Sequence, residues 1–190
     1  MSHDEQANGA SNIDVTVVSI NYNHCDGLRR TILSIQELLR ADCSVEHLLV
    51  DGQSEDKSQI VAHEYGYGQN ISHASLRKKI LVKKDGGLWE AMFNGLQNAK
   101  GTYVHFVHAG DTFFDSHKIS AFYEHLRQHN VDVGVCDVGL LRGNRVKKYF
   151  HAGFDRRFVS GGLMPPHPGL VIKRSLLNEV RAFADFQFQL

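Results

Sequence analysis

The chain has 190 residues, enough for one domain with a substantial core, and its 42% hydrophobic and 22% charged residues are typical of a globular protein. Because 21 Lys and Arg balance 21 Asp and Glu, the composition gives no net field that would favour a nucleic acid or an anionic membrane. The three cysteines, Cys25, Cys43 and Cys136, are too scattered for a disulfide framework or a zinc site, and they favour a reducing, cytoplasmic compartment. No apolar run is long enough to span a bilayer, which leaves peripheral association with the inner face of the plasma membrane as the expected form of any membrane contact.

Predicted strands and helices alternate along most of the chain. Residues 1–12 are polar and are expected to form a flexible tail, and residues 13–190 are expected to form one domain. Strands are expected at 13–20, 47–50, 79–82 and 103–107, and helices at 26–40, 54–65 (with Ser54 as its N-cap), 88–99 and 116–128. Further on, the sequence predicts a strand at 131–138, a hairpin at 140–150, a loop at 161–168 that holds all three prolines, an extended segment at 170–172 and a last helix from Ser175.

This alternation predicts an α/β fold with a mainly parallel central sheet and helices on both faces. In such a sheet the carboxyl ends of the strands lie along one edge, where open α/β sheets bind their ligands. Polar or aromatic residues follow four of the predicted strands, namely Asn21 with Tyr22, Asp51, Asp85 and Asp111. We therefore expect these side chains to line one cleft, although each Asp taken alone has an ordinary explanation as a turn former or helix cap.

The chemistry of these side chains suits a nucleoside diphosphate. A Tyr ring can cover a base, and a carboxylate can accept a hydrogen bond from a base N–H or a ribose hydroxyl. A further carboxylate offers hard oxygen ligands to Mg or Mn, and such a cation neutralises a leaving diphosphate. The expected ligand class is therefore a nucleotide with a divalent metal.

Four segments together carry a resemblance to a known family. They read VTVVSINYN at 15–23, LVDGQS at 49–54, DGGLWEAMFNG at 85–95 and HAGD at 108–111. In this order they resemble the inverting, nucleotide-sugar glycosyltransferases of family 2, which have the GT-A fold, and in particular the bacterial branch that builds surface polysaccharides. The first and third segments are specific, and the others are specific only as part of the series.

The resemblance implies roles for the predicted cleft residues. Tyr22, next to Asn21 in the first segment, would pack on the nucleotide base, and Asp51 would contact the base. Asp85 would line the ribose and sugar side of the donor.

The same resemblance implies a metal and diphosphate site. Asp111 would hold Mn or Mg together with the diphosphate, as the last residue of the family's acidic triplet. The first position of that triplet is Ala109 here, which leaves a thinner metal shell. His167, in MPPHPG at 164–169, matches a His that lies near the donor diphosphate or the acceptor in many relatives.

The implied reaction transfers a sugar from a nucleoside-diphosphate donor to a lipid-linked or oligosaccharide acceptor. It needs a base within reach of the attacking hydroxyl. RAFADFQFQ at 181–189 resembles the family segment just before the Asp that serves as this base, and Asp185 is out of register with it. The base is therefore expected beyond Leu190, the domain is expected to be incomplete at its C-terminus, and no catalytic residue is assigned.

Two alternatives stay open at this stage. The chain could be a sugar-nucleotide-binding module without turnover, because the region of the base is missing. It could also be a sugar nucleotidyltransferase, but that class needs a Gly-rich, Arg-bearing loop after its first strand, and residues 21–27 do not supply one. The basic run RKKILVKK at 77–84 is consistent with a solvated sheet edge or with attraction to diphosphate or lipid head groups.

Overall fold

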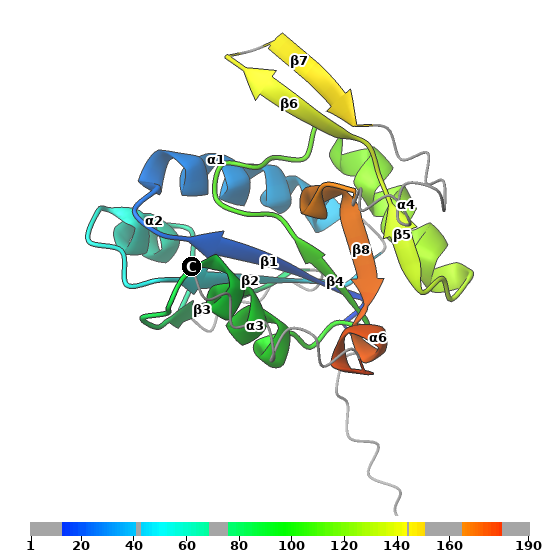
Figure 1. Ribbon diagram of the computed structural model, residues 1–190, viewed down its shortest axis with the longest axis horizontal. Helices are drawn as coiled ribbons and strands as arrows, with labels where there is room; N and C mark the ends of the chain where they lie inside the picture. The colour runs from blue at the N-terminus through cyan, green and yellow to red at the C-terminus, as the bar shows by residue number, and fades with distance from the viewer. Residues whose placement is uncertain (1–12, 41–42, 69–75, 144, 151–164, 180–190) are drawn as a thin grey trace, which may run out of the picture.

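The computed structural model describes residues 13–40, 43–68, 76–143, 145–150 and 165–179, and its centre is a six-stranded sheet (Figure 1). The strand order is β3-β2-β1-β4-β8-β5. The strands are β1 (Val15–Asn21), β2 (Val45–Asp51), β3 (Leu76–Val82), β4 (Tyr103–Phe106), β8 (Leu170–Lys173) and β5 (Val133–Val135). The first four in this order run parallel, and β8 is antiparallel to both of its neighbours. The predicted mainly parallel α/β sheet is confirmed.

Helices cover both faces of this sheet. They are α1 (Cys25–Gln36) with the 3-10 turn η1 (Glu37–Arg40), α2 (Ser58–Glu64), α3 (Leu88–Asn98), α4 (Ser116–Gln128), the 3-10 turn η2 (His167–Gly169) and α6 (Arg174–Glu179). The helices α1, α2 and α4 share core clusters with one face, and α3 and α6 share a cluster with the other. None of the described helices is long and apolar enough to cross a bilayer.

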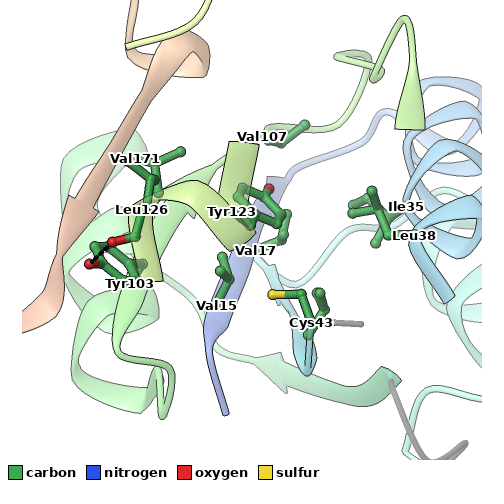
Figure 2. Close-up of a cluster of buried hydrophobic side chains, with 11 residues drawn as sticks. Val15, Val17, Ile35, Leu38, Cys43, Tyr103, Val107, Tyr123, Leu126 and Val171 are labelled. Carbon is green, nitrogen blue, oxygen red and sulfur yellow. Dashed lines mark hydrogen bonds between the residues drawn. The ribbon is translucent and has the colours of Figure 1, made fainter. Parts of the chain in front are cut away.

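Strand β1 is buried along its whole length because both of its faces are covered. Val15 and Val17 point to the cluster with α1 and α4 that Figure 2 shows, and Val18 points to α3. Helix α3 approaches so closely that a methyl group added at Gly95 would lie 2.5 Å from Val18 Cγ1. This close packing fixes α3, and with it the loop at its N-terminus, against the carboxyl half of β1.

Several sequence predictions are corrected by the structure. Helix α2 begins at Ser58, after Lys57, so Ser54 is not its N-cap. The strand expected at 131–138 ends at Val135, and the chain then leaves the sheet for a separate hairpin of β6 (Val138–Arg142) and β7 (Arg145–Phe150). The tail at 1–12, the start of the loop at 161–168 and the segment at 181–189 with Asp185 lie outside the described residues.

Two histidines are fully buried and paired as neutral rings. His47 Nε2 lies 2.9 Å from Ser19 Oγ, which itself donates to the Val107 carbonyl, so this ring nitrogen is the donor. Tyr67 OH then donates to His47 Nδ1. His105 is paired likewise, with Nδ1 2.7 Å from Tyr123 OH and Nε2 2.8 Å from the Pro168 carbonyl. Burial lowers the pKa of His47 to about 3 and that of His105 to about 4.

These histidines predict that the fold weakens on mild acidification. Both pKa values lie below the ordinary value of 6.5, so between this pH and about pH 4 the unfolded chain binds protons that the folded chain does not. The stabilisation that comes from keeping these rings neutral is fully present above pH 6.5. As the pH drops below this value, the free energy of unfolding should fall by about 1.4 kcal/mol per pH unit for each of these histidines. Urea unfolding measured at a series of pH values in this range checks the slope.

A variant pair assigns the slope to the buried rings. His47→Gln should reduce the slope even if it also lowers stability at neutral pH, and His117→Gln, at an exposed position of α4, should leave the slope unchanged. A free energy of unfolding that does not vary with pH over this interval would contradict the assignment.

Candidate functional site

A cavity of about 530 Å³ opens at the carboxyl edge of the parallel strands, where the expected cleft was placed. Its walls come from the ends of β1, β2 and β4, from the loop between β3 and α3, and from the first turns of α3. The lining residues are Ile20, Asn21, Tyr22, His24, Gly52, Lys84, Asp85, Gly86, Gly87, Leu88, Ala91, His108 and Ala109. The volume is within the range of pockets that hold small molecules.

Tyr22 and Asp85 both lie against Gly52 at this cavity. A methyl group added at Gly52 would lie 3.1 Å from Tyr22 Cδ2 and 3.3 Å from Asp85 Oδ2. Tyr22 is 66% exposed, so its ring is available to a ligand, and Asp85 is held in place because its Oδ1 accepts from Gly87 N at 3.0 Å. Gly87 has a φ of 125°, a conformation that favours glycine. An aromatic face and a carboxylate oxygen are thus presented side by side.

Asp51 lies behind the cavity in a closed hydrogen-bond ring. Asn21 and Asp51 are paired in register, and Asn21 Nδ2 donates to Asp51 Oδ2 at 2.7 Å. Ser54 donates twice to the same carboxylate, from its N and from its Oγ, both at 2.8 Å. Asp51 is fully buried, and the bonds of Ser54 explain why this serine is not a helix cap. Asn21 Oδ1 has no hydrogen-bond partner among the described residues.

The turn after β4 is organised by Thr31, a fully buried residue of α1. Its Oγ1 lies 2.7 Å from the Asp111 carbonyl and 3.2 Å from the His108 carbonyl, and it accepts from Gly110 N at 3.0 Å. Gly110 has a φ of 107°, and a side chain there would lie 3.0 Å from the His24 ring. The position of Asp111 is therefore set by a helix packed beneath the turn.

Burial dominates the electrostatics of this turn. The pKa of the Asp111 carboxyl is raised by burial, against the opposing effects of the hydrogen bond from His108 N and the charge of His167. Burial also lowers the pKa of His108 to about 4, and the His108 and His167 rings lie 4.7 Å apart between centroids. Both ring nitrogens of His108 have no hydrogen-bond partner among the described residues. Buried polar atoms without hydrogen-bond partners of this kind can be satisfied by a polar ligand.

The structure brings most of the predicted site residues together. Asn21, Tyr22 and Asp85 line the cavity. Asp51 and Asp111, which were expected to line it, do not: Asp51 is fully buried by its hydrogen-bond partners, and Asp111 sits in the turn after β4. His167 does not line it either, but Asp111 and His167 interact with one another and lie beside His108, which does. The roles proposed for all of these residues stay predictions.

Sequence reasoning missed four residues of the site, namely Thr31, Lys84, His24 and His108. Thr31 carries a faint signal, as a polar residue beside the apolar stripe of α1. Lys84 was considered as part of the basic run at 77–84, either at a solvated sheet edge or attracted to diphosphate or lipid head groups, and its place directly before Asp85 puts it in the cavity wall. His24 follows the Tyr22 turn, and its Nδ1 donates to the Ala109 carbonyl at 3.1 Å, a contact that nothing in the sequence indicates.

The residues of this site could hold a divalent metal only if a phosphate ligand supplied further oxygen ligands to it. Among the described residues no group of three or more His, Cys, Asp or Glu side chains could hold a metal ion by itself. Mg and similar cations are often held by one or two carboxylates together with substrate phosphates and water. Asp111 supplies one such carboxylate, with the unpartnered His108 ring beside it.

Comparison with protein families gives a match over nearly the whole chain. The model of Glycosyl transferase family 2 matches residues 16–180. An uncharacterized glycosyltransferase of Mycobacterium tuberculosis is 27% identical over 177 residues, covering 92% of this chain and 63% of that protein. The minor teichoic acid biosynthesis protein GgaB of Bacillus subtilis is 32% identical over 120 residues, covering 56% of this chain and 13% of that protein. The chain thus spans less than two thirds of the length of these relatives.

Solved structures share the fold. A mannosyltransferase from Pyrobaculum calidifontis in complex with GDP-Man and Mn2+ superposes with a TM-score of 0.63 at 17% identity, covering 90% of this chain and 47% of that one. S. aureus TarS 1-349 in complex with UDP-GlcNAc superposes with a TM-score of 0.67 at 18% identity, covering 88% and 47%. The GT-A fold expected from the sequence is confirmed.

The ring around Asp51 predicts a stability effect that is independent of any ligand. Asp51→Asn places an amide NH2 among donors that all need an acceptor, so it should lower the free energy of unfolding at pH 7 by about 2 kcal/mol. Urea unfolding of the purified variant measures this loss. Glu55→Gln, at an exposed position in the same loop, is the matched control and should be neutral. An Asp51→Asn variant as stable as the parent would show that the ring does not hold the two strand ends.

The half-buried Asp111 predicts the opposite effect. Because its folded pKa is raised, its ionised form destabilises the fold at neutral pH, and the cost is absent at a pH below its ordinary value of 3.8. Asp111→Asn should therefore raise the free energy of unfolding at pH 7, with a gain that shrinks as the pH falls. Chemical denaturation at pH 7 and at a pH below 3.8 tests this. The control is Asp132→Asn, because the Asp132 side chain is 73% exposed. Destabilisation by Asp111→Asn at pH 7 would refute the electrostatic explanation.

Proposed function

Because the chain belongs to glycosyltransferase family 2, we propose that its cavity binds a nucleoside-diphosphate sugar and that the protein transfers this sugar with inversion to a saccharide or lipid-linked acceptor. The observation that carries the proposal is the meeting of Tyr22, Gly52 and Asp85 at one cavity on the carboxyl edge of the sheet. This arrangement offers a stacking surface beside a hydrogen-bond acceptor, the two kinds of group that bind a nucleoside.

The base and ribose would occupy the side of the cavity near β1 and β2. Tyr22 would stack on the base, since its ring is exposed beside a glycine that leaves the ring face open. Asp51 is buried and engaged, so we propose that it acts on the base by orienting Asn21, whose Oδ1 has no partner among the described residues. Asp85 would accept a hydrogen bond from the ribose or the sugar.

The diphosphate would lie toward the turn after β4. Lys84 lines the cavity and offers a positive charge, and His108 offers two ring nitrogens without partners. Asp111, with His167 beside it, would hold Mn or Mg at the diphosphate. That metal would supply charge neutralisation for the departing nucleoside diphosphate. The mannosyltransferase solved with GDP-Man and Mn2+ and TarS solved with UDP-GlcNAc support a UDP or GDP donor.

The proposed acceptor is inferred from related proteins and not from side-chain contacts in this structure. The relationship to a minor teichoic acid biosynthesis protein supports a role in building a bacterial cell-surface polymer. A lipid-linked or oligosaccharide acceptor would be glycosylated on the cytoplasmic side of the membrane, where nucleotide sugars are present.

Donor binding without turnover is the second candidate, and one observation favours it. Inverting transfer needs a base within hydrogen-bonding reach of the acceptor hydroxyl. Asp85 is the single carboxylate among the described cavity-lining residues, and it is proposed on the donor side. His108, with a pKa of about 4, is a weak base at neutral pH. The two candidates are separated by assaying sugar transfer, because both predict binding of the donor.

A thermal-shift panel of nucleoside diphosphates tests the proposed function. UDP or GDP should raise the unfolding midpoint when Mn is present, since a ligand at about one hundred times its Kd stabilises the fold by about 2.7 kcal/mol. Tyr22→Ala should remove most of the shift, and Asp111→Asn should remove its dependence on metal.

Matched controls make the panel specific. Tyr149→Ala removes a tyrosine of similar exposure, 57% against 66% for Tyr22, far along the chain from the cavity and should keep the full shift. Asp132→Asn should also keep it. A flat response to all nucleotides, or a shift that Tyr22→Ala leaves intact, would reject the proposed function.

A further inference from the structure

The hairpin of β6 and β7 stands apart from the rest of the fold, and nothing in the proposed function uses it. It forms a two-stranded sheet of its own and does not pair with any strand of the six-stranded sheet (Figure 1, yellow). A two-stranded hairpin gains little stability by itself in water. A surface of this kind is therefore a candidate for contact with something outside the chain.

The hairpin carries a strong local charge in an otherwise neutral chain. Arg142, Arg145, Lys147 and Lys148 are all exposed, and residues 138–150 contain no Asp or Glu. Because the chain as a whole has a formal net charge of zero, the remainder carries the opposite sign. The hairpin is thus a locally positive element, with four cations and no carboxylate to offset them within residues 138–150.

Large apolar side chains are exposed among these charges. Leu140 is 58% exposed, Leu141 53% and Tyr149 57%. A methyl group at Gly139 would meet Val146 Cγ1 at 3.4 Å and Tyr149 Cε1 at 3.7 Å, so Tyr149 and Val146 share one side of the hairpin. On the opposite face of the hairpin, Lys148 Nζ lies 4.6 Å from the centre of the Phe150 ring. Leu140 and Leu141 are consecutive in β6 and therefore point to opposite faces of the hairpin, so both of its faces present an exposed leucine. Single exposed apolar residues are ordinary, but several of them interleaved with cations on one projecting hairpin are the composition of an interfacial element.

The base of the hairpin is fixed close to the proposed diphosphate end of the site. Cys136 N donates to the Gly169 carbonyl at 2.8 Å, and a side chain at Gly169 would lie 2.7 Å from the Cys136 carbonyl oxygen and 2.8 Å from Val138 Cγ2. Gly169 closes the short η2 turn that begins with His167. The hairpin therefore has a defined attachment next to the turn that carries His167.

We propose that the β6–β7 hairpin docks the chain on an anionic phospholipid membrane. The four cations would lie at the phosphate head groups, and the exposed Leu and Tyr side chains would enter the boundary between head groups and acyl chains. An acidic protein surface or a nucleic acid would satisfy the cations but would leave the two leucines in water. The proposal goes beyond the proposed function and does not depend on it, because membrane binding requires neither donor nor turnover.

Co-sedimentation with vesicles tests this docking. The intact chain should bind vesicles of phosphatidylcholine with one-third phosphatidylglycerol, should bind pure phosphatidylcholine weakly, and should lose affinity as salt is raised. Each cation near such a surface contributes about fivefold in affinity, so Lys147→Glu with Lys148→Glu should weaken binding at least about tenfold. Lys57→Glu with Lys118→Glu changes the same charge at exposed positions outside the hairpin and should have little effect.

A second pair tests the apolar contact separately. Leu140→Ser with Leu141→Ser should weaken binding severalfold, whereas Leu33→Ser with Ile60→Ser, at positions 46% and 59% exposed in α1 and α2, should not. Circular dichroism and thermal melting of each variant confirm that the fold is kept. Equal binding to neutral and anionic vesicles, or hairpin variants that bind like their controls, would overturn the proposal. The proposal would also be overturned if the chain does not bind vesicles but forms a dimer that the Leu140 and Leu141 substitutions dissociate. A second copy of the chain would then be the partner of the hairpin.

Discussion

The junction between the ends of β1 and β2 is the constraint on which the site depends. Asn21 and Asp51 stand opposite one another in register, and their side chains are joined directly and through Ser54. The backbone adds a further bond, from Gly52 N to the Asn21 carbonyl at 2.9 Å. The Asn21 amide NH2, the Asp51 carboxylate and Ser54 satisfy one another, and Asn21 Oδ1 is the atom of this group without a partner among the described residues. The next residues along each strand, Tyr22 and Gly52, are therefore presented to the cavity from a fixed base.

The turn after β4 differs from this junction, because its side chains have few hydrogen-bond partners. There the backbone is well satisfied by Thr31, but the side chains are not: Asp111 is partly buried with a raised pKa, and His108 has two ring nitrogens without partners among the described residues. Buried polar groups without partners weaken a fold. Their concentration on one side of the cavity is consistent with a polar ligand that completes them, and functional sites commonly carry such local costs. The rigid β1–β2 junction and the incompletely satisfied β4 turn thus face one ligand space.

Sequence reasoning succeeded where the physics of a parallel sheet is general. Apolar β-branched runs predicted β1 and β4, and the rule that parallel strands end at one edge was enough to bring Tyr22 and Asp85 to one cavity. It failed where a tertiary contact replaced a local one. Ser54 has the residue type of an N-cap, but it bonds to Asp51 instead, three residues away at the end of a strand. Thr31 could not be recognised, because its partners lie 77 to 80 residues further along the chain.

The central claim is that a nucleotide lies across the cavity with its base at Tyr22 and its diphosphate at the turn after β4. A crystal structure of the chain grown with UDP and Mn measures this directly. The expected result is a base stacked on the Tyr22 ring beside Gly52, with Asn21 at its edge and the metal between the diphosphate and Asp111. A nucleotide bound elsewhere on the molecule, or in this cavity with its base away from Tyr22 and no metal at Asp111, would contradict the claim.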